Sequence, residues 1–547
     1  MKRRDFITRV AASAGATYAA MKALDLLEKP VTAQQSRGPF QLQGNGQGKR
    51  IVILGGGLGG MCSAYELGKI GYDCVILEAT ARVGGRCRTV RGGDQISEID
   101  GPTQTAQFDQ GLYWNPGPAR IPYHHVTIDY CKELGVPLEV IVNLNRQQYY
   151  YQVNSGPLSG RKVHAREAVT DMRGYISELL AKAINQDVLD GDLTTEDKER
   201  MIEFLRTYGN LNPDLFYRGS SRRGYAVPQG AAANAGELED PYDLSALLQL
   251  GFANYEVFEW GYDQQMTMFQ PVGGMDQIAQ AFEREVKDKI RYQSEVTAIR
   301  KAPDRVHIIY KDASGNEREE IGDFCICNIP LPVLSGITSD FSADMQQAIA
   351  GVAYAVTGKC GLQFNRRFWE EDEDIFGGIT QSNQPNANQI WYPSSGYLSQ
   401  KGVLVGYYGG AGGDLPPSRR VELSLEQGSN IHPQYRDHFE NGVAIFWPRV
   451  PYQQGGWATY TTQSRQQYYA RLNEPDDNIY LVGEHLSYLT GWMAGALESA
   501  RLVTAAINER VQQGSGPVPE VTGPVAPDTS PSTPTVPESP AGATTSN

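Results

Sequence analysis

The sequence predicts an α/β fold in which one parallel sheet is assembled from distant parts of the chain. A short apolar run at residues 50–54 leads directly into a glycine turn and then into a helix-compatible segment at 61–70. A second apolar run follows at 74–77, and similar runs recur near the other end of the chain at 324–328 and 479–482. Short apolar runs bounded by turn residues are typical of buried strands, and strands alternating with helices are typical of parallel sheets.

The composition indicates a globular protein with several domains. The chain has 547 residues, of which 40% are hydrophobic and 20% are charged, and this length exceeds what a single hydrophobic core supports. The formal net charge is -14. Because nucleic-acid binding depends on clustered Lys and Arg, a nucleic-acid partner is not expected.

The N-terminus resembles a twin-arginine export signal. Arg3 and Arg4 precede a weakly apolar run of small residues at 10–27. The run is too short and too interrupted by charged residues to form a stable membrane span; the alternative is a basic amphipathic helix. We therefore expect 1–33 to be a signal peptide and the mature protein to lack a transmembrane span. The expected location is the periplasm or the medium.

The C-terminus and the cysteines carry little chemistry. Residues 514–547 are mostly Gly, Pro, Ser, Thr, Val and Ala, which cannot bury enough apolar surface to offset the entropy of ordering, so a disordered tail is expected. The seven cysteines indicate no disulfide framework. Cys325 and Cys327 are separated by one residue, whereas a metal-binding Cys-x-x-Cys pair has two. No metal site is predicted.

The middle of the chain contains a predicted helical region and a region of predicted strands. Residues 168–189 and 195–208 show helical spacing, and we expect them to belong to a helical insertion at 136–249. From 389 to 408, Tyr, Trp, Val and Leu alternate with Gly and Ser. This alternation favours strands of a mixed sheet that covers a pocket.

The glycine turn predicts a dinucleotide site. Gly55 allows the tight turn, Gly57 lets the backbone approach a pyrophosphate, and Gly60 lets the helix pack closely on its strand. The second strand ends in Glu78, 18 residues after Gly60, where a carboxylate can accept hydrogen bonds from an adenosine ribose. These features predict a Rossmann-like domain but do not distinguish NAD from FAD.

The segment after the second strand resembles the flavin amine oxidases. It reads Glu78-Ala-Thr-Ala-Arg-Val-Gly-Gly-Arg86, and in that family the Gly-Gly-Arg lies against the pyrophosphate of FAD. The resemblance continues near the C-terminus, where Ile-Tyr-Leu-Val-Gly-Glu484-His precedes Gly491-Trp-Met-Ala-Gly-Ala496. By this resemblance Glu484 holds the ribityl chain or a ribose hydroxyl, and Val296 contacts adenine through its backbone.

The resemblance implies a full set of FAD-binding positions. Because 484–492 contains no cysteine, the flavin is expected to be noncovalent. The expected cofactor-binding residues are Gly55, Gly57, Leu58, Gly59, Gly60, Glu78, Ala79, Gly85, Arg86, Gly117, Pro118, Ala119, Arg120, Val296, Glu484, Gly491, Trp492, Met493, Ala494, Gly495 and Ala496.

The substrate motifs are similar to those of L-amino-acid oxidases within this family. Arg120, in Gly-Pro-Ala-Arg-Ile-Pro, matches an arginine that binds the substrate carboxylate, and Tyr392, in Ile-Trp-Tyr-Pro, matches the tyrosine that makes the second contact. Trp492 matches an aromatic wall beside the substrate amine. Lys359 matches a catalytic lysine that holds a water molecule against flavin N5.

One segment departs from the family pattern. Several L-amino-acid oxidases carry a histidine shortly before the Gly-Gly-Met-Asp segment, and residues 255–271 contain none. The side-chain pocket is therefore expected to differ. An acid nearby, Glu259 or Asp263, could favour a cationic substrate.

These inferences lead to an expected domain organisation. The FAD-binding domain combines 48–90, 270–335 and 455–512, and the substrate-binding domain combines 91–135, 250–269 and 336–454. The helical insertion at 136–249 and the two terminal segments complete the chain.

The expected activity is that of an FAD-dependent L-amino-acid oxidase. The substrate α-carbon passes a hydride to flavin N5, and L-amino acid, water and O2 become a 2-oxo acid, ammonia and hydrogen peroxide. One alternative is a monoamine or polyamine oxidase of the same fold. Another is a noncatalytic exported flavoprotein that binds a partner. A homodimer remains open.

Overall fold

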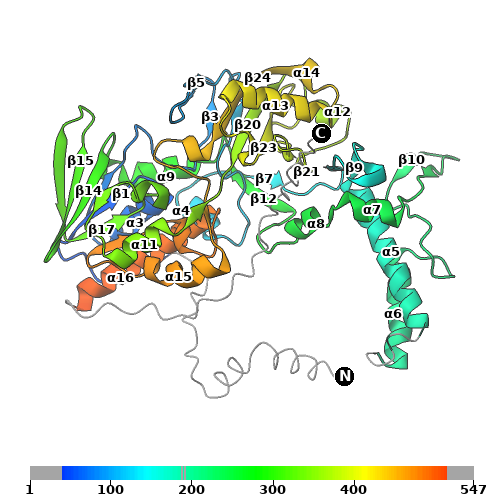
Figure 1. The fold of residues 1–547 in the computed structure, drawn as a ribbon, viewed down its shortest axis with the longest axis horizontal. Coiled ribbons are helices and arrows are strands. Elements are labelled where there is room, and N and C mark those ends of the chain that lie inside the picture. The colour runs from blue at the N-terminus through cyan, green and yellow to red at the C-terminus, as the bar shows by residue number, and fades with distance from the viewer. Residues whose placement is uncertain (1–39, 187–188, 190–192, 514–547) are drawn as a thin grey trace, which may run out of the picture. The chain divides into compact units, whose positions relative to one another are not determined.

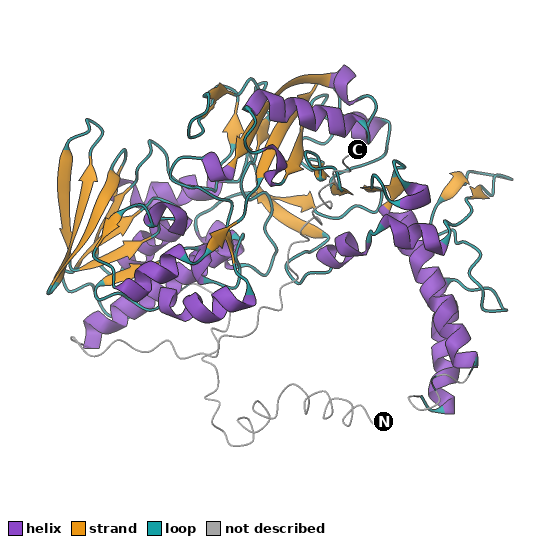
Figure 2. Cartoon of the chain, in the orientation of Figure 1, coloured by secondary structure: helices purple, strands orange, loops and turns teal. Residues whose placement is uncertain are grey.

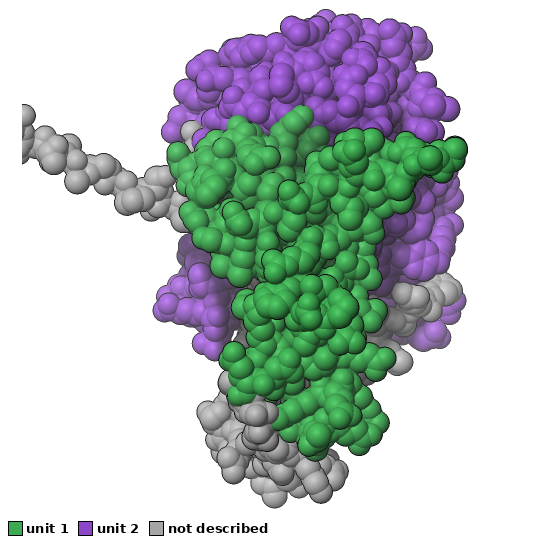
Figure 3. Space-filling view, turned by 90° about the vertical axis from the view of Figure 1, so that its right-hand side faces the viewer, with its two compact units in different colours: residues 1–35, 145–257, 380–383 green, residues 36–144, 258–379, 384–547 purple. Residues whose placement is uncertain are grey.

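The computed structural model describes residues 40–186, 189 and 193–513. The predicted signal peptide and C-terminal tail lie outside the described residues. Contacts divide the chain into two units, shown in Figure 3. Among the described residues, unit 1 comprises 145–257 and 380–383, and unit 2 comprises the remainder. Within these ranges, no helix has the length and apolar character needed to cross a membrane.

Unit 2 contains the parallel sheet that the sequence predicts. All neighbouring strands of this five-stranded sheet run parallel. In spatial order the strands are β13 (Ile290–Arg291), β2 (Asp73–Leu77), β1 (Arg50–Leu54), β17 (Phe324–Cys327) and β26 (Ile479–Leu481). Segments from both ends of the chain therefore meet in one sheet, and the predicted α/β class is confirmed.

Both faces of the parallel sheet are buried, which explains why its strands are continuous apolar runs. Side chains such as Ile51 and Ile53 pack against three helices, and the alternate side chains Val52 and Leu54 pack against a second sheet. The helices are α3 (Leu58–Lys69), α9 (Asp276–Val286) and α16 (Met493–Gln513). The second, largely antiparallel, sheet consists of β16 (Glu317–Gly322), β15 (Arg305–Lys311), β14 (Glu295–Ala302) and β18 (Thr338–Ser339) (Figure 1).

A third sheet in unit 2 carries the strands expected within 389–408. Its antiparallel strands, in order, are β24 (Phe439–Phe446), β20 (Gly358–Phe364), β23 (Gly402–Tyr408) and β22 (Gln389–Trp391). Helix α13 (Pro417–Ser429) packs against it. On β20, Gly361 leaves room for the indole of Trp114, because a Cβ there would lie 2.6 Å from that ring.

A short antiparallel pair of strands from distant parts of the sequence fixes the segment that carries the expected substrate arginine. Strands β7 (Leu138–Val142) and β12 (Thr267–Pro271) pair antiparallel. Ile121 bridges to Phe269 through two backbone hydrogen bonds of 2.8 and 3.0 Å. Arg120 is thereby anchored beside β12, and α4 (Val126–Glu133) begins shortly after it.

Unit 1 contains the predicted helical pair. Helix α5 (Ala165–Asn185) and helix α6 (Thr195–Gly209) lie side by side (Figure 1). Apolar side chains including Ala181, Ile184 and Leu205 form one hydrophobic cluster of unit 1 around this pair, and a second cluster lies around Leu247 and Leu250. The hydroxyl of Thr194 accepts a hydrogen bond from the Asp197 N–H, so the start of α6 is capped as its sequence indicates.

The remaining elements are short (Figure 2). In unit 1 they are β8 (Tyr149–Tyr151), β9 (Val163–His164), β10 (Tyr225–Val227), β11 (Glu237–Leu238) and α7 (Leu244–Leu250). In unit 2 they are β3 (Val90–Arg91), β4 (Gln95–Ile96), β5 (Gln104–Thr105), β6 (Tyr113–Trp114), α10 (Leu331–Leu334), α11 (Ala343–Ala350), β19 (Ala353–Tyr354), α12 (Phe368–Glu371), α14 (Tyr435–His438), β25 (Ala458–Thr459) and α15 (Thr462–Asn473). Two elements straddle the unit boundaries, namely α8 (Ala253–Glu259) and β21 (Ile379–Ser382).

The close packing of α3 on its strand predicts the effect of one methyl group. A Cβ at Gly60 would lie 2.2 Å from the carbonyl oxygen of Gly55, so Gly60→Ala must move the helix or the turn, at a cost of about 1–3 kcal/mol. We expect a lower melting temperature and a lower ratio of flavin to protein absorbance. The matched control is Gly409→Ala, since nothing lies within 4 Å of a Cβ there. Equal flavin content and melting temperature in both variants would contradict the packing argument.

Candidate active site

The glycine turn after β1 exposes the start of α3 for an anion. Gly55 has a φ of +96°, and its N–H donates to the Leu77 carbonyl oxygen at 2.9 Å. Gly57 caps α3 without any side-chain hydrogen bond. A helix start without a side-chain cap leaves N–H groups of its first turn for a ligand such as a phosphate. The turn therefore fits the pyrophosphate of a dinucleotide.

Glu78 is held at the end of β2 by the same turn. Its carboxylate accepts one hydrogen bond from the Gly56 N–H and one from the Thr80 N–H, both at 2.8 Å. The side chain is nearly buried. These contacts fix the carboxylate beside the glycine turn, where the sequence predicts a ribose contact.

Arg86 and Glu484 bring the two ends of the chain together. Arg86 Nη1 donates to Glu484 Oε1 at 2.9 Å and to the Gly456 carbonyl oxygen at 2.8 Å. Burial lowers the pKa of Arg86, but the charges of Glu484 and Tyr354 and the hydrogen bond to Glu484 together outweigh burial and raise the pKa above its ordinary value. The other oxygen of Glu484 accepts from the Gly491 N–H at 3.2 Å. The predicted motifs around Arg86, Glu484 and Gly491 thus form one connected cluster.

The other predicted cofactor positions lie on or next to the same elements, except for Val296 and residues 117–119. Asn328, which no sequence motif selects, lies between the start of α3 and the end of β26. A Cβ at Gly57 would lie 2.7 Å from its side-chain amide, and a Cβ at Gly59 would lie 2.8 Å from that amide and 2.7 Å from Val482. The remaining predicted residues are Leu58 and Gly60 in α3, Ala79 after β2, Gly85 before Arg86, Gly117, Pro118 and Ala119 before Arg120, Val296 in β14, and Met493, Ala494, Gly495 and Ala496 in the first turn of α16.

Arg120 is a buried cation with unused hydrogen-bond donors. Its Nη2 donates to Gln264 Oε1 at 3.3 Å, whereas its Nε and Nη1 are buried and have no hydrogen-bond partner among the described residues. The residue is only 9% exposed, and burial lowers the pKa of Arg120 to about 10. The guanidinium therefore stays charged at neutral pH and lacks an acceptor for two of its nitrogens.

Aromatic rings surround the guanidinium of Arg120. Its Cζ lies 4.5 Å from the ring centre of Trp391 and 6.0 Å from that of Trp492. The expected position of Trp492 beside the substrate amine stays a prediction. The ring of Tyr407 stacks on Trp391 with centres 6.4 Å apart. Stacked rings hold a guanidinium plane in a fixed orientation. Trp391 and Tyr407 were not predicted.

The expected contact between Tyr392 and a carboxylate held by Arg120 is not supported by the geometry. The Tyr392 hydroxyl is hydrogen-bonded to His432 Nε2 at 2.8 Å, and His432 Nδ1 contacts Glu373. Successive side chains of a strand point to opposite faces, and Trp391 is the neighbour that faces Arg120. Tyr392 is therefore committed to a separate, buried network.

Lys359 lies beside Arg120 rather than in solvent. It is 7% exposed, and its Nζ donates to the Gly117 carbonyl oxygen at 2.7 Å. Its Nζ also lies 4.7 Å from the ring centre of Trp391, the ring that stacks on Arg120. Burial, with a smaller contribution from the charge of Arg120, lowers the pKa of Lys359 to about 7. An amine in this place changes its charge near neutral pH.

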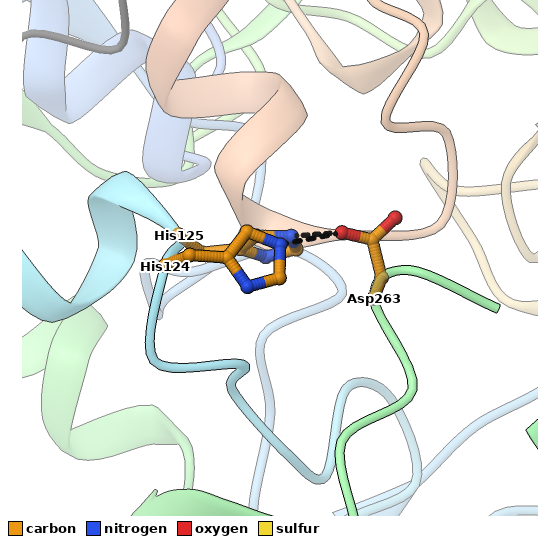
Figure 4. A group of neighbouring side chains, drawn as sticks. All are labelled: His124, His125 and Asp263. Atoms are coloured by element: carbon orange, nitrogen blue, oxygen red, sulfur yellow. Dashed lines mark hydrogen bonds and ion pairs between the residues drawn. The ribbon is translucent and has the colours of Figure 1, made fainter. Parts of the chain in front are cut away.

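Two histidines and an aspartate lie next to the aromatic wall. His124 Nε2 and His125 Nε2 contact the same oxygen of Asp263, at 2.9 and 2.8 Å (Figure 4). Burial raises the pKa of Asp263, but the hydrogen bonds and the charge interactions with the two histidines together outweigh burial and lower the pKa below its ordinary value. The ring of His125 meets that of Trp492 edge-on, 5.1 Å between centres. One carboxylate oxygen of Asp263 is thus shared by the two imidazoles.

The pKa of Lys359 predicts how stability depends on pH. In the folded protein the pKa is about 7, compared with an ordinary value of 10.5, so between these values the unfolded chain binds more protons and stability rises with pH. Lys359→Met removes this contribution. We therefore expect the difference in free energy of unfolding, unsubstituted protein minus variant, to increase with pH. The expected slope is up to about 1.4 kcal/mol per pH unit between pH 7 and 10. Denaturant unfolding at several pH values measures this difference. If the free energies of unfolding of the two proteins changed with pH in parallel, a buried lysine that titrates near pH 7 would be refuted.

Comparison with known proteins shows which family the chain resembles. The model of the flavin containing amine oxidoreductases matches residues 58–508. An L-amino-acid oxidase of Gloydius blomhoffii is 24% identical over 486 residues, which cover 85% of this chain and 90% of the relative. An L-amino acid oxidase of Cerastes cerastes is 25% identical over 497 residues, which cover 87% of this chain and 90% of that relative.

Solved structures show the same fold. Cyclohexylamine oxidase from Brevibacterium oxydans has a TM-score of 0.56 and 16% identity, covering 85% of this chain and 100% of that one. A putrescine oxidase bound to putrescine has the same score and identity, covering 84% and 99%. The glycine turn, the uncapped start of α3 and the Arg86–Glu484 cluster fit FAD, the predicted cofactor, which the family match confirms. The chain belongs to the flavin containing amine oxidoreductase family.

Proposed function

We propose that this protein is an FAD-dependent oxidase of L-amino acids, which it converts with water and O2 to 2-oxo acids, ammonia and hydrogen peroxide. The observation that carries the proposal is the buried guanidinium of Arg120, with two nitrogens that have no hydrogen-bond partner among the described residues. The curated relatives named as L-amino-acid oxidases support the choice of substrate and its handedness.

A substrate carboxylate would complete the hydrogen bonding of Arg120. Leaving a buried donor without a partner costs about 1–3 kcal/mol, and more for a charged group. A carboxylate offers two oxygens to a planar guanidinium, which gives two parallel charge-assisted bonds. Trp391 holds the plane of the guanidinium, so the bound acid has one orientation. A plain amine carries no group that satisfies these donors, and the site favours amino acids.

The chain's other contribution is to orient the substrate and to hold protons nearby. FAD, when bound, supplies the redox chemistry by accepting a hydride from the substrate carbon and by passing electrons to O2. We assign to Lys359 the holding of a water molecule, because its ammonium has three donors and the Gly117 carbonyl oxygen takes one. Trp492 forms a wall beside the substrate, since its ring lies 6.0 Å from Arg120 Cζ.

Substitution of Arg120 tests the proposal. Arg120→Met keeps the apolar stem but removes the charge, and truncating one partner of a buried charge pair costs about 2–5 kcal/mol. We therefore expect kcat/KM for L-amino acids to fall by about 30-fold to several thousand-fold. The rate with the amine that lacks the carboxylate should change little. Steady-state hydrogen peroxide production with matched acid and amine substrates measures both.

Tyr392→Phe is the matched control. Its hydroxyl is bonded to His432, so its loss should leave kcat/KM for L-amino acids within a few-fold of the unsubstituted value. An Arg120→Met variant that oxidises L-amino acids at the original efficiency would overturn the proposal. Efficient oxidation of amines and none of acids by the unsubstituted protein would support the amine oxidase alternative instead.

A further inference from the structure

Three side chains beside the substrate site converge on one point. His124 and His125 precede α4, and Asp263 lies in the loop before β12. His124 Nε2, His125 Nε2 and a carboxylate oxygen of Asp263 all lie within 4.8 Å of one another. Figure 4 shows both imidazoles directed at the same carboxylate. The sequence shows no sign of this arrangement, because Asp263 is 138 residues from His125.

Two imidazole nitrogens and one carboxylate oxygen are a recognised set of metal ligands. Zinc binds such donors at about 2.0–2.2 Å in a tetrahedral arrangement, which separates neighbouring ligand atoms by about 3.3 Å. The observed separations of 2.9 and 2.8 Å from the Asp263 oxygen are a few tenths of an ångström shorter. An ion would therefore require the carboxylate to move slightly outward. It would also require the two imidazole nitrogens, which lie within 4.8 Å of each other, to adjust to the same spacing of about 3.3 Å, with a fourth position left for water.

We infer that His124, His125 and Asp263 bind one divalent transition-metal ion, with Zn²⁺ the best match to the donor set. The two histidine side chains are 8% and 1% exposed, while that of Asp263 is 26% exposed. Buried imidazoles give the ligands fixed positions, and the partly exposed carboxylate gives an ion a route in from solvent. The ion uses all three donors at once, whereas without it one carboxylate oxygen must serve both imidazoles.

A bound ion would act as a positioning element for the substrate arginine. Gln264, next to Asp263, accepts the hydrogen bond from Arg120 Nη2 at 3.3 Å. On the other side, the ring of His125 packs against Trp492. An ion bound by Asp263 and His125 would thus fix the position of Gln264 relative to the indole ring of Trp492. The inference is independent of which substrate the enzyme oxidises.

Gln265 offers a sharp test of whether His124 binds metal. A metal on Nε2 requires a proton on Nδ1, which a neighbouring oxygen must accept. His124 Nδ1 lies 3.2 Å from the amide nitrogen of Gln265, whose oxygen accepts from the Tyr123 N–H at 2.9 Å. Metal binding therefore requires this amide to turn. Glutamate at 265 would present oxygen to both groups without turning.

The experiment measures zinc binding by the holoenzyme without an affinity tag. After chelator treatment and desalting, Zn²⁺ is titrated by calorimetry, and bound zinc is counted by mass spectrometry after gel filtration. We expect one Zn²⁺ per chain, at least tenfold weaker binding in Asp263→Asn and in His124→Gln, and tighter binding in Gln265→Glu. His307→Gln is the matched control, since His307 contacts a single carboxylate, that of Glu319, on an exposed part of β15, and its zinc binding should be unchanged.

Flavin content and the near-ultraviolet circular dichroism spectrum establish that each variant is folded. The inference is overturned if the unsubstituted holoenzyme takes up no zinc. It is also overturned if folded Asp263→Asn and His124→Gln retain full affinity, because the ion would then lie elsewhere. Weakened binding in Gln265→Glu would contradict the role given to His124 Nδ1.

Discussion

The hydrogen-bonded pair of Arg86 and Glu484 connects parts of the chain that are 398 residues apart. Its geometry depends on the parallel sheet, because β1 and β2 carry the first motif to the same edge to which β26 carries the second. The pair is partly screened from water, so its charges interact strongly, and the Glu484 carboxylate favours the ionised form of Arg86. Packing of α3 and α16 on the same face of the sheet holds the two halves of the cofactor site together, and the Arg86–Glu484 pair adds a direct polar link between them.

The substrate site follows a different principle, which is to leave a charge incompletely paired. Arg120 is held by the bridge of Ile121 to Phe269 and by the ring of Trp391, and neither supplies an acceptor. Folding must bear the cost of this buried cation. Binding of an anion offsets that cost. The site therefore selects its substrate through the missing hydrogen-bond acceptor, which a carboxylate supplies, rather than through a close fit to the substrate. The nearby amine of Lys359 has a pKa of about 7, which lets the net positive charge of the pocket vary around neutrality.

The cofactor half of the site could be read from sequence because its signals are local. A strand, a glycine turn and a helix are contiguous, and Gly55, Gly57 and Gly60 have separate steric reasons for lacking a side chain. The helices of unit 1 were predictable for the same reason, since Thr194 marks the start of α6. The substrate half depends on contacts between distant segments. Arg120 was selected from its motif, and its role stays a prediction, whereas its neighbours Tyr407 and Gln264 lie in other segments and have no local signature.

Two pairs of residues show what sequence reasoning could not decide. Trp391 and Tyr392 are adjacent on a strand end, so one faces Arg120 and the other faces away, and a shift of one residue exchanges the two faces. No rule of composition or spacing selects between them. His125 and Asp263 are too far apart in sequence for any motif to join them, and only the fold reveals that they meet.

Substrate selection by this flavoprotein depends most directly on recognition of a carboxylate. The visible spectrum of the holoenzyme, recorded without oxygen, would be followed during titration with an L-amino acid, its D enantiomer and the amine that lacks its carboxylate. Bleaching of the flavin by the L-amino acid alone is the predicted result. Bleaching by the amine at equal or lower concentration would contradict the account, because the buried guanidinium of Arg120 would then have no part in selecting the substrate.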